Sequence, residues 1–258
     1  MHANTPVLFE VRDRIAIITL NRPERRNAVD TALTDALSAA IERLETDADL
    51  SVGILRGNGP VFCAGMDLGA FLDGQAERIL FGPGGFAGLA KRRRKKPLIA
   101  AVHGAALAGG FELMLACDLV VSSPECRFGL PETRLGLMAG GGGALRLAQS
   151  LPRAVADEIL LLGDTFGAER AQALGLINRI VPAADLDSAA LELAAGVAAN
   201  APAALAASLA MVDAVVRDVD GASWALSDVL LRTLITGEDA REGALAFTEK
   251  RKPVWSGR

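Results

Sequence analysis

The stretch ALAGGFELMLACDLVV (Ala106–Val121) sets one carboxylate, Glu112, among glycines and strongly apolar residues. Gly109 and Gly110 predict the start of a helix that runs to Cys117, and the apolar run after it predicts a buried strand. Because desolvating a charged carboxylate is costly, Glu112 needs either a buried partner or a role in chemistry.

Short β-branched runs alternate with helical patterns in the sequence before this stretch. Val7–Pro23 (VLFEVRDRIAIITLNRP) predicts a β-hairpin. The apolar residues of Asp30–Leu44 recur at helical spacing, with Asp30 at the predicted N-cap. Ser51–Gly59 and Pro97–Gly104 predict two further strands, the second apolar on both faces and therefore interior. This alternation predicts an α/β core.

The second half of the chain is different in pattern. From about residue 143 it becomes Ala-rich and helical, interrupted by one extended piece, Leu176–Pro182 (LINRIVP). A chain of 258 residues fits one large domain, or a domain with an appendage. We therefore expect an α/β core followed by a helical C-terminal layer.

Composition excludes several classes of site. The N-terminus lacks a basic region followed by an apolar one, and no apolar run reaches the roughly 18 residues that a membrane span needs. The three cysteines and the two histidines, His2 and His103, show no zinc-binding spacing. We expect a protein of the cytoplasm that binds neither metal nor membrane.

Two segments in the middle of the chain show no clear pattern of a helix or a strand. Phe71–Ala90, rich in Gly and Phe, lacks strong periodicity, and we expect a mobile segment over a site. Lys91–Lys96 (KRRRKK) allows contact with phosphates or nucleic acid, but a solvated helix end with cations near the negative pole of the dipole is the favoured interpretation. The net charge of -4 also argues against nucleic acid.

Three glycine-containing segments carry the candidate chemistry: Gly59–Leu68, the quoted stretch, and Phe128–Leu137 with the glycines that follow it. A helix start at Gly109 exposes backbone N–H groups that can hold a developing negative oxygen, although tight helix packing explains a glycine equally. Met66 offers a second such N–H, in what is otherwise a turn.

Glu112 and Glu132 each have two interpretations. Glu112 is either a cap of the helix N-terminus or a catalytic group, and Glu132 is either a surface glutamate or its partner. Two glutamates in one cavity can divide the roles of acid and base if their surroundings separate their pKa values. Structural roles are favoured for Asp118, for His103 and, as a helix cap, for Asp67.

The segments together resemble the crotonase superfamily, the enoyl-CoA hydratase/isomerase family. The similarity covers nearly the whole chain: LNRPERRNAVD, FCAGMDL, KPLIAAVHGAALAGGFELMLACDL, FGLPETRLGL and EDAREGALAFTEKRKPVW follow in order. Each piece alone is a weak signal, and the order and spacing make the set specific.

The resemblance implies a fold and an assembly. The fold is an α/β spiral of β-β-α turns over residues 1–190, with a helical C-terminal trimerisation region over residues 191–258. The expected assembly is a homotrimer or a hexamer (dimer of trimers).

The resemblance also implies an activity, the syn addition of water across a 2,3-enoyl-CoA double bond or its reverse. The backbone N–H groups of Met66 and Gly109 match the family's oxyanion hole. Glu112 and Glu132, twenty residues apart, match its two catalytic glutamates. Gly140 matches a position at a helix N-terminus that helps to place the water. Coenzyme A is part of the substrate, so no separate cofactor is implied.

The positions that match CoA contacts are Arg25 and Arg26 toward the nucleotide, and Ala64 and Leu68 along the pantetheine tunnel. Phe247 and Lys250 match positions that, in relatives, reach the CoA of a neighbouring subunit. Packing of a helix explains Phe247 equally. Two residues depart from the family pattern: Met66 replaces a common Ala, and Gly69 replaces a common Lys, which weakens one phosphate contact.

Two other functions remain open. FGLPETRLGL followed by GGGALRL also resembles members that act on carnitinyl-CoA, which makes a dehydratase of a specialised acyl-CoA the second hypothesis. A CoA-binding scaffold without catalysis is the third.

Overall fold

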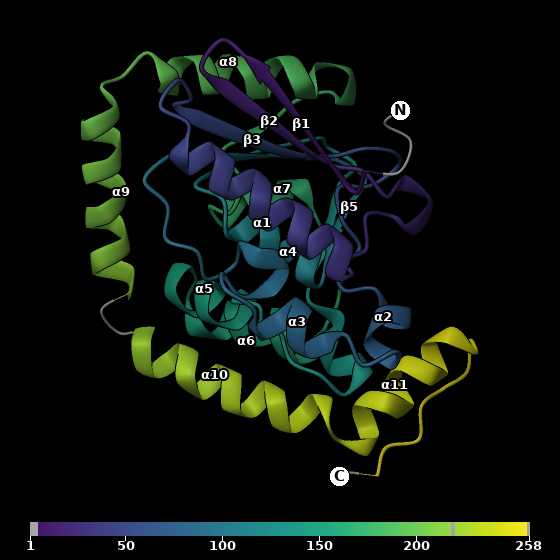
Figure 1. Cartoon of the computed structure of the whole chain (residues 1–258). Coiled ribbons are helices and arrows are strands. Elements are labelled where there is room, and N and C mark those ends of the chain that lie inside the picture. Colours follow the sequence, from purple (N-terminus) through teal and green to yellow (C-terminus); the bar gives the residue numbers. More distant parts are fainter. Residues whose placement is uncertain (1–4, 218–219, 257–258) are drawn as a thin grey trace.

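In the computed structural model, which describes residues 5–217 and 220–256, a six-stranded sheet crosses the molecule (Figure 1). Its strand order is β1-β2-β3-β4-β6-β9, and every neighbouring pair is parallel except the β1–β2 hairpin. The strands are β1 (Val7–Arg12), β2 (Ile15–Leu20), β3 (Val52–Gly57), β4 (Leu98–Val102), β6 (Leu119–Ser122) and β9 (Arg179–Ile180). The predicted hairpin and strands are therefore confirmed.

Helices cover both faces of this sheet, which explains why β2 and β4 are buried along their whole length (Figure 1). Ile15 and Ile17 of β2 pack in one cluster with α8 (Leu186–Ala198), whereas Ala16 and Ile18 pack in the other cluster with α1 (Thr31–Thr46). The alternation follows from the two-residue period of a strand. As predicted, Asp30 caps α1, since its carboxylate accepts a hydrogen bond from the N–H of Leu33 at 2.8 Å.

A second, three-stranded sheet lies beside the first and was not predicted from the sequence. It consists of β5 (Ala105–Leu107), β7 (Arg127–Gly129) and β8 (Phe166–Gly167). The chain passes from β4 in the large sheet to β5 in the small one, and then into α4 (Gly109–Leu115). It repeats this course through β6 and β7. This is the expected β-β-α spiral.

The remaining helices complete the spiral, and most of them lie in the lower half of Figure 1, while α9 runs down its left side. They are α2 (Leu68–Leu72), α3 (Ala76–Phe81), α5 (Gly143–Ser150), α6 (Arg153–Leu162), α7 (Ala168–Ala173), α9 (Pro202–Arg217), α10 (Asp220–Ile235) and α11 (Glu238–Thr248), with short 3-10 helices η1 (Pro23–Arg25), η2 (Phe86–Gly88), η3 (Pro131–Leu135) and η4 (Ala183–Asp185). The domain boundary expected at residue 190 falls inside α8, which covers the sheet.

The segment 71–90, expected to be a mobile segment over a site, contains α3, η2 and the end of α2, and it buries Ile79, Leu80 and Phe86. Its mobility stays a prediction. Its helices are too short for their periodicity to stand out in the sequence. As predicted, Asp67 caps α2, by accepting hydrogen bonds from the N–H groups of Gly69 and Ala70.

The basic run Lys91–Lys96 does not end a helix of its own, contrary to the favoured interpretation. Lys91, Arg92 and Arg94 form ion pairs with Asp228, Glu42 and Asp118. The ammonium of Lys96 instead donates to the carbonyls of Leu44 and Asp47, at the C-terminus of α1. One cation therefore does meet the negative end of a helix dipole, but the helix is remote in sequence.

Over residues 5–217 and 220–256, no single helix is long and apolar enough to cross a membrane. One bent helix pair, residues 183–198 with 202–214, passes the test by length and composition alone.

Candidate active site

A cavity of about 680 Å³ lies at one end of the spiral, between the loops that follow its strands and the C-terminal helices. All eleven residues singled out in the sequence lie on its wall: Arg25, Arg26, Ala64, Met66, Leu68, Gly109, Glu112, Glu132, Gly140, Phe247 and Lys250. The fold thus brings together positions that span most of the chain.

The backbone N–H of Met66 is held toward this cavity by a short parallel bridge to Val29. The N–H of Val29 donates to the carbonyl of Gly65 at 2.8 Å, and the N–H of Asp67 donates to the carbonyl of Val29 at 2.9 Å. Both bonds lie on the side of the turn that faces Val29. The N–H of Met66 therefore points to the opposite side. No group among the described residues accepts a hydrogen bond from it.

Gly109 presents the second backbone N–H, at the first residue of α4. Its N-cap residue, Ala108, has φ 49° and ψ -129°, which turns the chain sharply from β5 into the helix. A Cβ on Gly65 would lie 3.1 Å from the nitrogen of Gly109, so the turn that carries Met66 abuts the helix start. Met66 and Gly109 thus lie close together on the wall of one cavity, an arrangement that an oxyanion hole requires.

Glu112 lies one helical turn beyond Gly109, with its side chain buried. Its carboxylate accepts a hydrogen bond from the N–H of Gly143 at 2.8 Å, at the start of α5. Burial raises the pKa of Glu112 to about 7, against the opposing effect of the N–H groups of Gly143 and Gly141 and the charge of Arg146. The carboxylate of Glu112 is therefore bonded to the N-terminus of α5 and not to that of its own helix, α4.

Glu132 lies in η3 and is also buried, so the interpretation as a surface glutamate is wrong. Its Oε2 has no hydrogen-bond partner among the described residues. Burial, and then the negative charge of Glu112, raise the pKa of Glu132 well above its ordinary value. When one of these two carboxyls is ionised, the other is held protonated.

Gly140 lines the cavity, but it does not lie at the helix N-terminus, where the resemblance placed it. Its N–H donates to the carbonyl of Met138 at 2.8 Å, and α5 begins three residues later at Gly143, with Gly142 at the N-cap. The glycine run makes a tight turn before the helix, so the N–H group that begins α5 and donates to Glu112 lies at its end, at Gly143.

Cations gather on the wall of the cavity near solvent. Arg25, Arg26 and Lys250 are exposed, and Phe247, which is 67% exposed, does not pack into its helix interface. The helix-packing interpretation of Phe247 is therefore wrong for the single chain. Ala64 is tied to this region by the hydrogen bond from its N–H to the carbonyl of Arg26 at 3.0 Å.

The segment 71–90, which the sequence places over a site, supplies part of the apolar wall of the cavity, whereas the contribution of α10 was not predicted. Phe86 of η2 lies against Gly109, where a Cβ would collide with its ring, and Leu231 of α10 lies against Gly140. Ile235 and Leu80 complete this apolar part. These residues reach the site from distant segments, and no local pattern marks them.

Of the residues with predicted structural roles, Asp67 lines this cavity while it caps α2, whereas Asp118 and His103 lie off it. Asp118 accepts from Arg94 and from the N–H of Leu98, and His103 contacts the carbonyl of Gly59 at 2.8 Å. His2 lies outside the described residues. No cluster of three or more His, Cys, Asp and Glu residues suited to a metal ion occurs in the part of the chain that the structure describes.

Comparison with known proteins gives three consistent findings. A family model described as enoyl-CoA hydratase/isomerase matches residues 10–258. The chain is 42% identical to a carnitinyl-CoA dehydratase from Salmonella typhi over 247 residues, which is 93% of this chain and 94% of that protein.

Among solved structures, a carnitinyl-CoA hydratase from Mycobacterium avium superposes with a TM-score of 0.90 at 40% identity, over 99% of this chain and 100% of the other. An enoyl-CoA hydratase from Mycobacterium tuberculosis H37Rv superposes with a TM-score of 0.79 at 45% identity, over the same shares of the two chains.

Proposed function

The chain belongs to the enoyl-CoA hydratase/isomerase family, and on that premise we propose that it catalyses the reversible syn addition of water to a 2,3-enoyl-CoA thioester. The observation that carries the proposal is the cavity itself. It combines two buried carboxyls with two free backbone N–H groups at one place.

The N–H groups of Met66 and Gly109 would bind the thioester oxygen. Attack of water at Cβ moves negative charge onto that oxygen, and fixed donors stabilise the enolate that forms. Losing one such donor costs about 3 kcal/mol in typical enzymes. The Phe86 ring against Gly109 helps to exclude bulk water there, which strengthens both hydrogen bonds.

The two carboxyls would divide the proton transfers. Glu112, which the N–H of Gly143 and the charge of Arg146 help to keep ionised, takes a proton from the water that attacks Cβ. Glu132, which is held protonated, donates a proton to Cα on the same face. The hydroxyl and one proton have then been added, and proton exchange with solvent restores the two carboxyls.

Coenzyme A would enter with its phosphates near Arg25, Arg26 and Lys250, and with its adenine against the exposed ring of Phe247. Ala64 and Leu68 would line the path of the pantetheine arm. We propose no further cofactor and no metal, because CoA is carried by the substrate.

The test is an activity panel of 2-enoyl-CoAs from C4 upward, followed by loss of the conjugated thioester absorbance. Glu112→Gln and Glu132→Gln should each lower kcat by about 100-fold or more. Glu158→Gln is the matched control, because Glu158 is an exposed glutamate paired with Arg170. If both cavity variants kept wild-type rates, the site assignment would fail.

A carnitinyl-CoA dehydratase is the second candidate, because relatives bearing that name are 42% identical over most of the chain. Crotonyl-CoA and its trimethylammonium analogue, crotonobetainyl-CoA, separate the two. A specialist would turn over the charged substrate at least tenfold faster in kcat/KM. A non-catalytic scaffold would instead bind CoA and hydrate no member of the panel.

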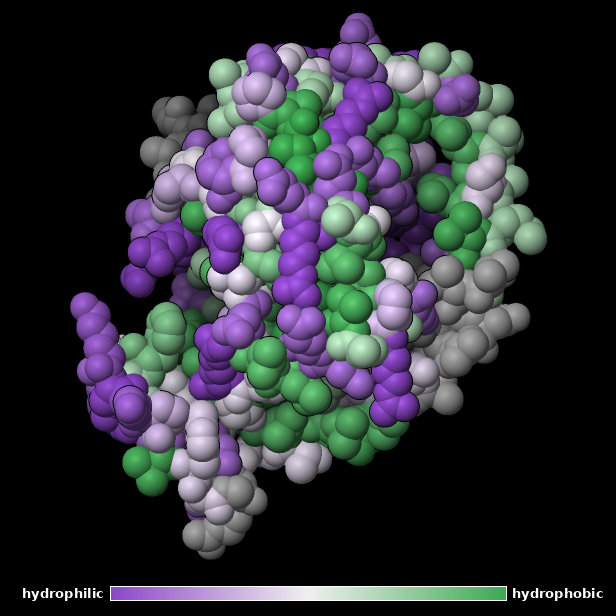
Figure 2. Space-filling model, turned by 180° about the vertical axis from the view of Figure 1, so that it is seen from behind, coloured by the Kyte–Doolittle hydropathy of each residue, from purple (hydrophilic) through white to green (hydrophobic). Residues whose placement is uncertain are grey.

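We also propose that the protein is a homotrimer or a hexamer and that it is located in the cytoplasm. The support for the assembly is the exposure of large apolar side chains on α9 and α10, including Met211, Val212, Leu226 and Val229. Figure 2, which shows the molecule from the other side, has hydrophobic side chains gathered over the lower part of that face as well. Sedimentation velocity tests the assembly, and a monomer at micromolar concentration would contradict it.

Nucleic acid is not a proposed partner. Four of the six cations of Lys91–Lys96 are engaged within the chain, in ion pairs or at a helix C-terminus. Failure to retain RNA at low salt is the expected result.

A further inference from the structure

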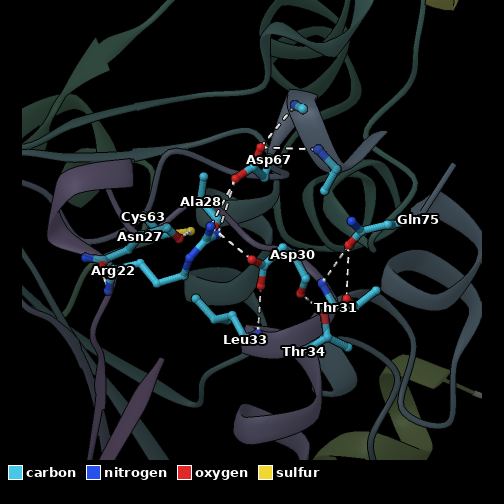
Figure 3. Close-up of polar contacts among 12 residues, drawn as sticks. Arg22, Asn27, Ala28, Asp30, Thr31, Leu33, Thr34, Cys63, Asp67 and Gln75 are labelled. Carbon is cyan, nitrogen blue, oxygen red and sulfur yellow. Dashed lines mark hydrogen bonds and ion pairs between the residues drawn. The ribbon is translucent and has the colours of Figure 1, made fainter. Parts of the chain in front are cut away.

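Arg22, a residue outside the cavity, joins three parts of the chain that surround the turn at Met66. It follows β2, and its side chain is 17% exposed. Figure 3 shows it between the carbonyl of Ala28, to which it donates a short hydrogen bond, and the carboxylates of Asp30 and Asp67. The nitrogen–oxygen distances to these carboxylates are 2.9 Å and 3.3 Å.

The contact with Ala28 leads directly to the proposed oxyanion donor through two peptide groups. The carbonyl of Ala28 and the N–H of Val29 belong to one peptide, and that N–H donates to the carbonyl of Gly65 at 2.8 Å. The carbonyl of Gly65 and the N–H of Met66 belong to the next. In a trans peptide the two groups point in opposite directions, so Arg22 and the substrate oxygen stand at the two ends of one hydrogen-bonded chain.

A positive charge at the far end of such a chain affects the donor at the near end. It polarises the carbonyl of Ala28, which makes the N–H of Val29 a stronger donor to Gly65. Gly65 in turn makes the N–H of Met66 a stronger donor. Chains of hydrogen bonds in a protein interior strengthen one another in this way.

The same guanidinium also restricts movement of the turn. Asp30 caps α1 and Asp67 caps α2, so Arg22 ties the starts of two helices to the segment that carries Met66. A rotation of the Gly65–Met66 peptide would break the bond from Val29. Any shift of Asp67 would break its ion pair with Arg22.

We infer that Arg22 is a positioning residue that orients and polarises the N–H of Met66 through the peptides of Ala28–Val29 and Gly65–Met66. The inference rests on the proposed function, because it assigns a task to the oxyanion hole. Arg22 does not line the cavity, so it acts without touching the substrate.

The experiment compares Arg22→Met, Arg22→Lys and Asp30→Asn with the wild type. Met removes the charge and the donor, whereas Lys keeps the charge but loses the planar fork that serves three acceptors. Asp30→Asn is the matched control for stability. It removes one ion pair of Arg22 and leaves the contact with Ala28 and an oxygen for capping α1.

Two readouts distinguish positioning from general support of the fold. The first is the split between kcat and KM for the best enoyl-CoA of the panel. The second is affinity for acetoacetyl-CoA, whose enolate places negative charge on the thioester oxygen, compared with affinity for butyryl-CoA, which carries none. Thermal unfolding is recorded for every variant.

Arg22→Met should lower kcat about 10- to 100-fold, somewhat less than the loss of an oxyanion donor, with KM within about twofold. Affinity for acetoacetyl-CoA should fall by a similar factor, while that for butyryl-CoA is unchanged. Arg22→Lys should recover part of both losses, and it supplies the comparison with wild type if the Met variant does not fold.

The inference is overturned if Arg22→Met retains kcat, if Arg22→Lys shows neither loss nor selective weakening of acetoacetyl-CoA binding, or if Asp30→Asn loses kcat in the same proportion to its loss of thermal stability. A wild type that hydrates no enoyl-CoA would instead overturn the proposed function. The two failures are therefore distinguishable.

Discussion

Replacing Glu112 with Gln should stabilise the protein by an amount that grows with pH, while hydration is lost. The carboxyl of Glu112 has an ordinary pKa of 4.5, and burial raises it to about 7. Each unit of difference between folded and unfolded pKa corresponds to about 1.4 kcal/mol. The wild-type protein therefore bears a cost of roughly 3 kcal/mol at alkaline pH for holding this charge in the cavity.

The direction of the pH dependence follows from where the proton is bound. Below pH 4.5 the carboxyl is protonated in both the folded and the unfolded chain, so it contributes nothing to the difference. Between 4.5 and about 7 the folded protein binds a proton that the unfolded chain has lost, so stability falls as pH rises. Above about 7 the whole cost is present.

Gln cannot ionise, and its carbonyl oxygen can still accept the hydrogen bond from Gly143. Urea unfolding at about pH 5, 6, 7 and 8 measures the free energy of unfolding of both proteins. The difference in favour of Glu112→Gln should increase by about 2 to 3 kcal/mol across this range. The loss of the Glu112 charge also lowers the pKa of Glu132, which acts in the same direction.

Glu158→Gln is the control, because Glu158 is exposed and its difference from wild type should stay flat with pH. A flat difference for Glu112→Gln as well would refute the reasoning. So would a Gln variant that is less stable than wild type at pH 8, since that would mean that the charged carboxylate is fully compensated in the folded state.

Three further outcomes are expected. Asn27→Ala should lower the free energy of unfolding by about 3 kcal/mol. The reason is that the fully buried amide of Asn27 donates to three backbone carbonyls, and that its φ of 55° disfavours Ala. A loss below about 1 kcal/mol, measured by urea unfolding, would contradict this. Gly141→Ala should lower kcat strongly, because the added Cβ would collide with the carboxylate of Glu112; unchanged kcat and an unchanged pH profile would speak against it. Lys250→Ala should raise KM for acyl-CoA about three- to tenfold with little effect on kcat, because an exposed phosphate contact contributes about 1 kcal/mol. If the variant and the wild type had the same KM at low salt and again at high salt, the result would count against the contact.

Much of the fold was predictable because it depends on local patterns. The hairpin, the cap at Asp30 and the fully apolar β4 each follow from residue type and spacing within a short window. The small sheet was missed, since β5 and β7 have three residues each and β8 has two. Strands that short carry no period, and only pairing across the chain defines them.

The candidate site was predictable in its members but not in its electrostatics. The sequence alone offered Glu112 as either a cap or a catalytic group, and its position in the structure is compatible with both interpretations. Its carboxylate does meet a helix N-terminus, that of α5 at Gly143, and it lines the cavity at the same time. Gly140 was placed too early because a run of glycines does not reveal where a helix begins.

The sequence by itself determined the alternation of strands and helices, the two glutamates and the glycine turns, because these are properties of nearby residues. Tertiary structure alone decided that Glu132 is buried beside Glu112, that Phe86 and Leu231 form the apolar wall, and that Arg22 stands behind the Met66 turn. The physical reason is the same in each case. Desolvation and the pKa shifts that follow from it depend on which distant segments exclude water from a group, and no local pattern encodes that.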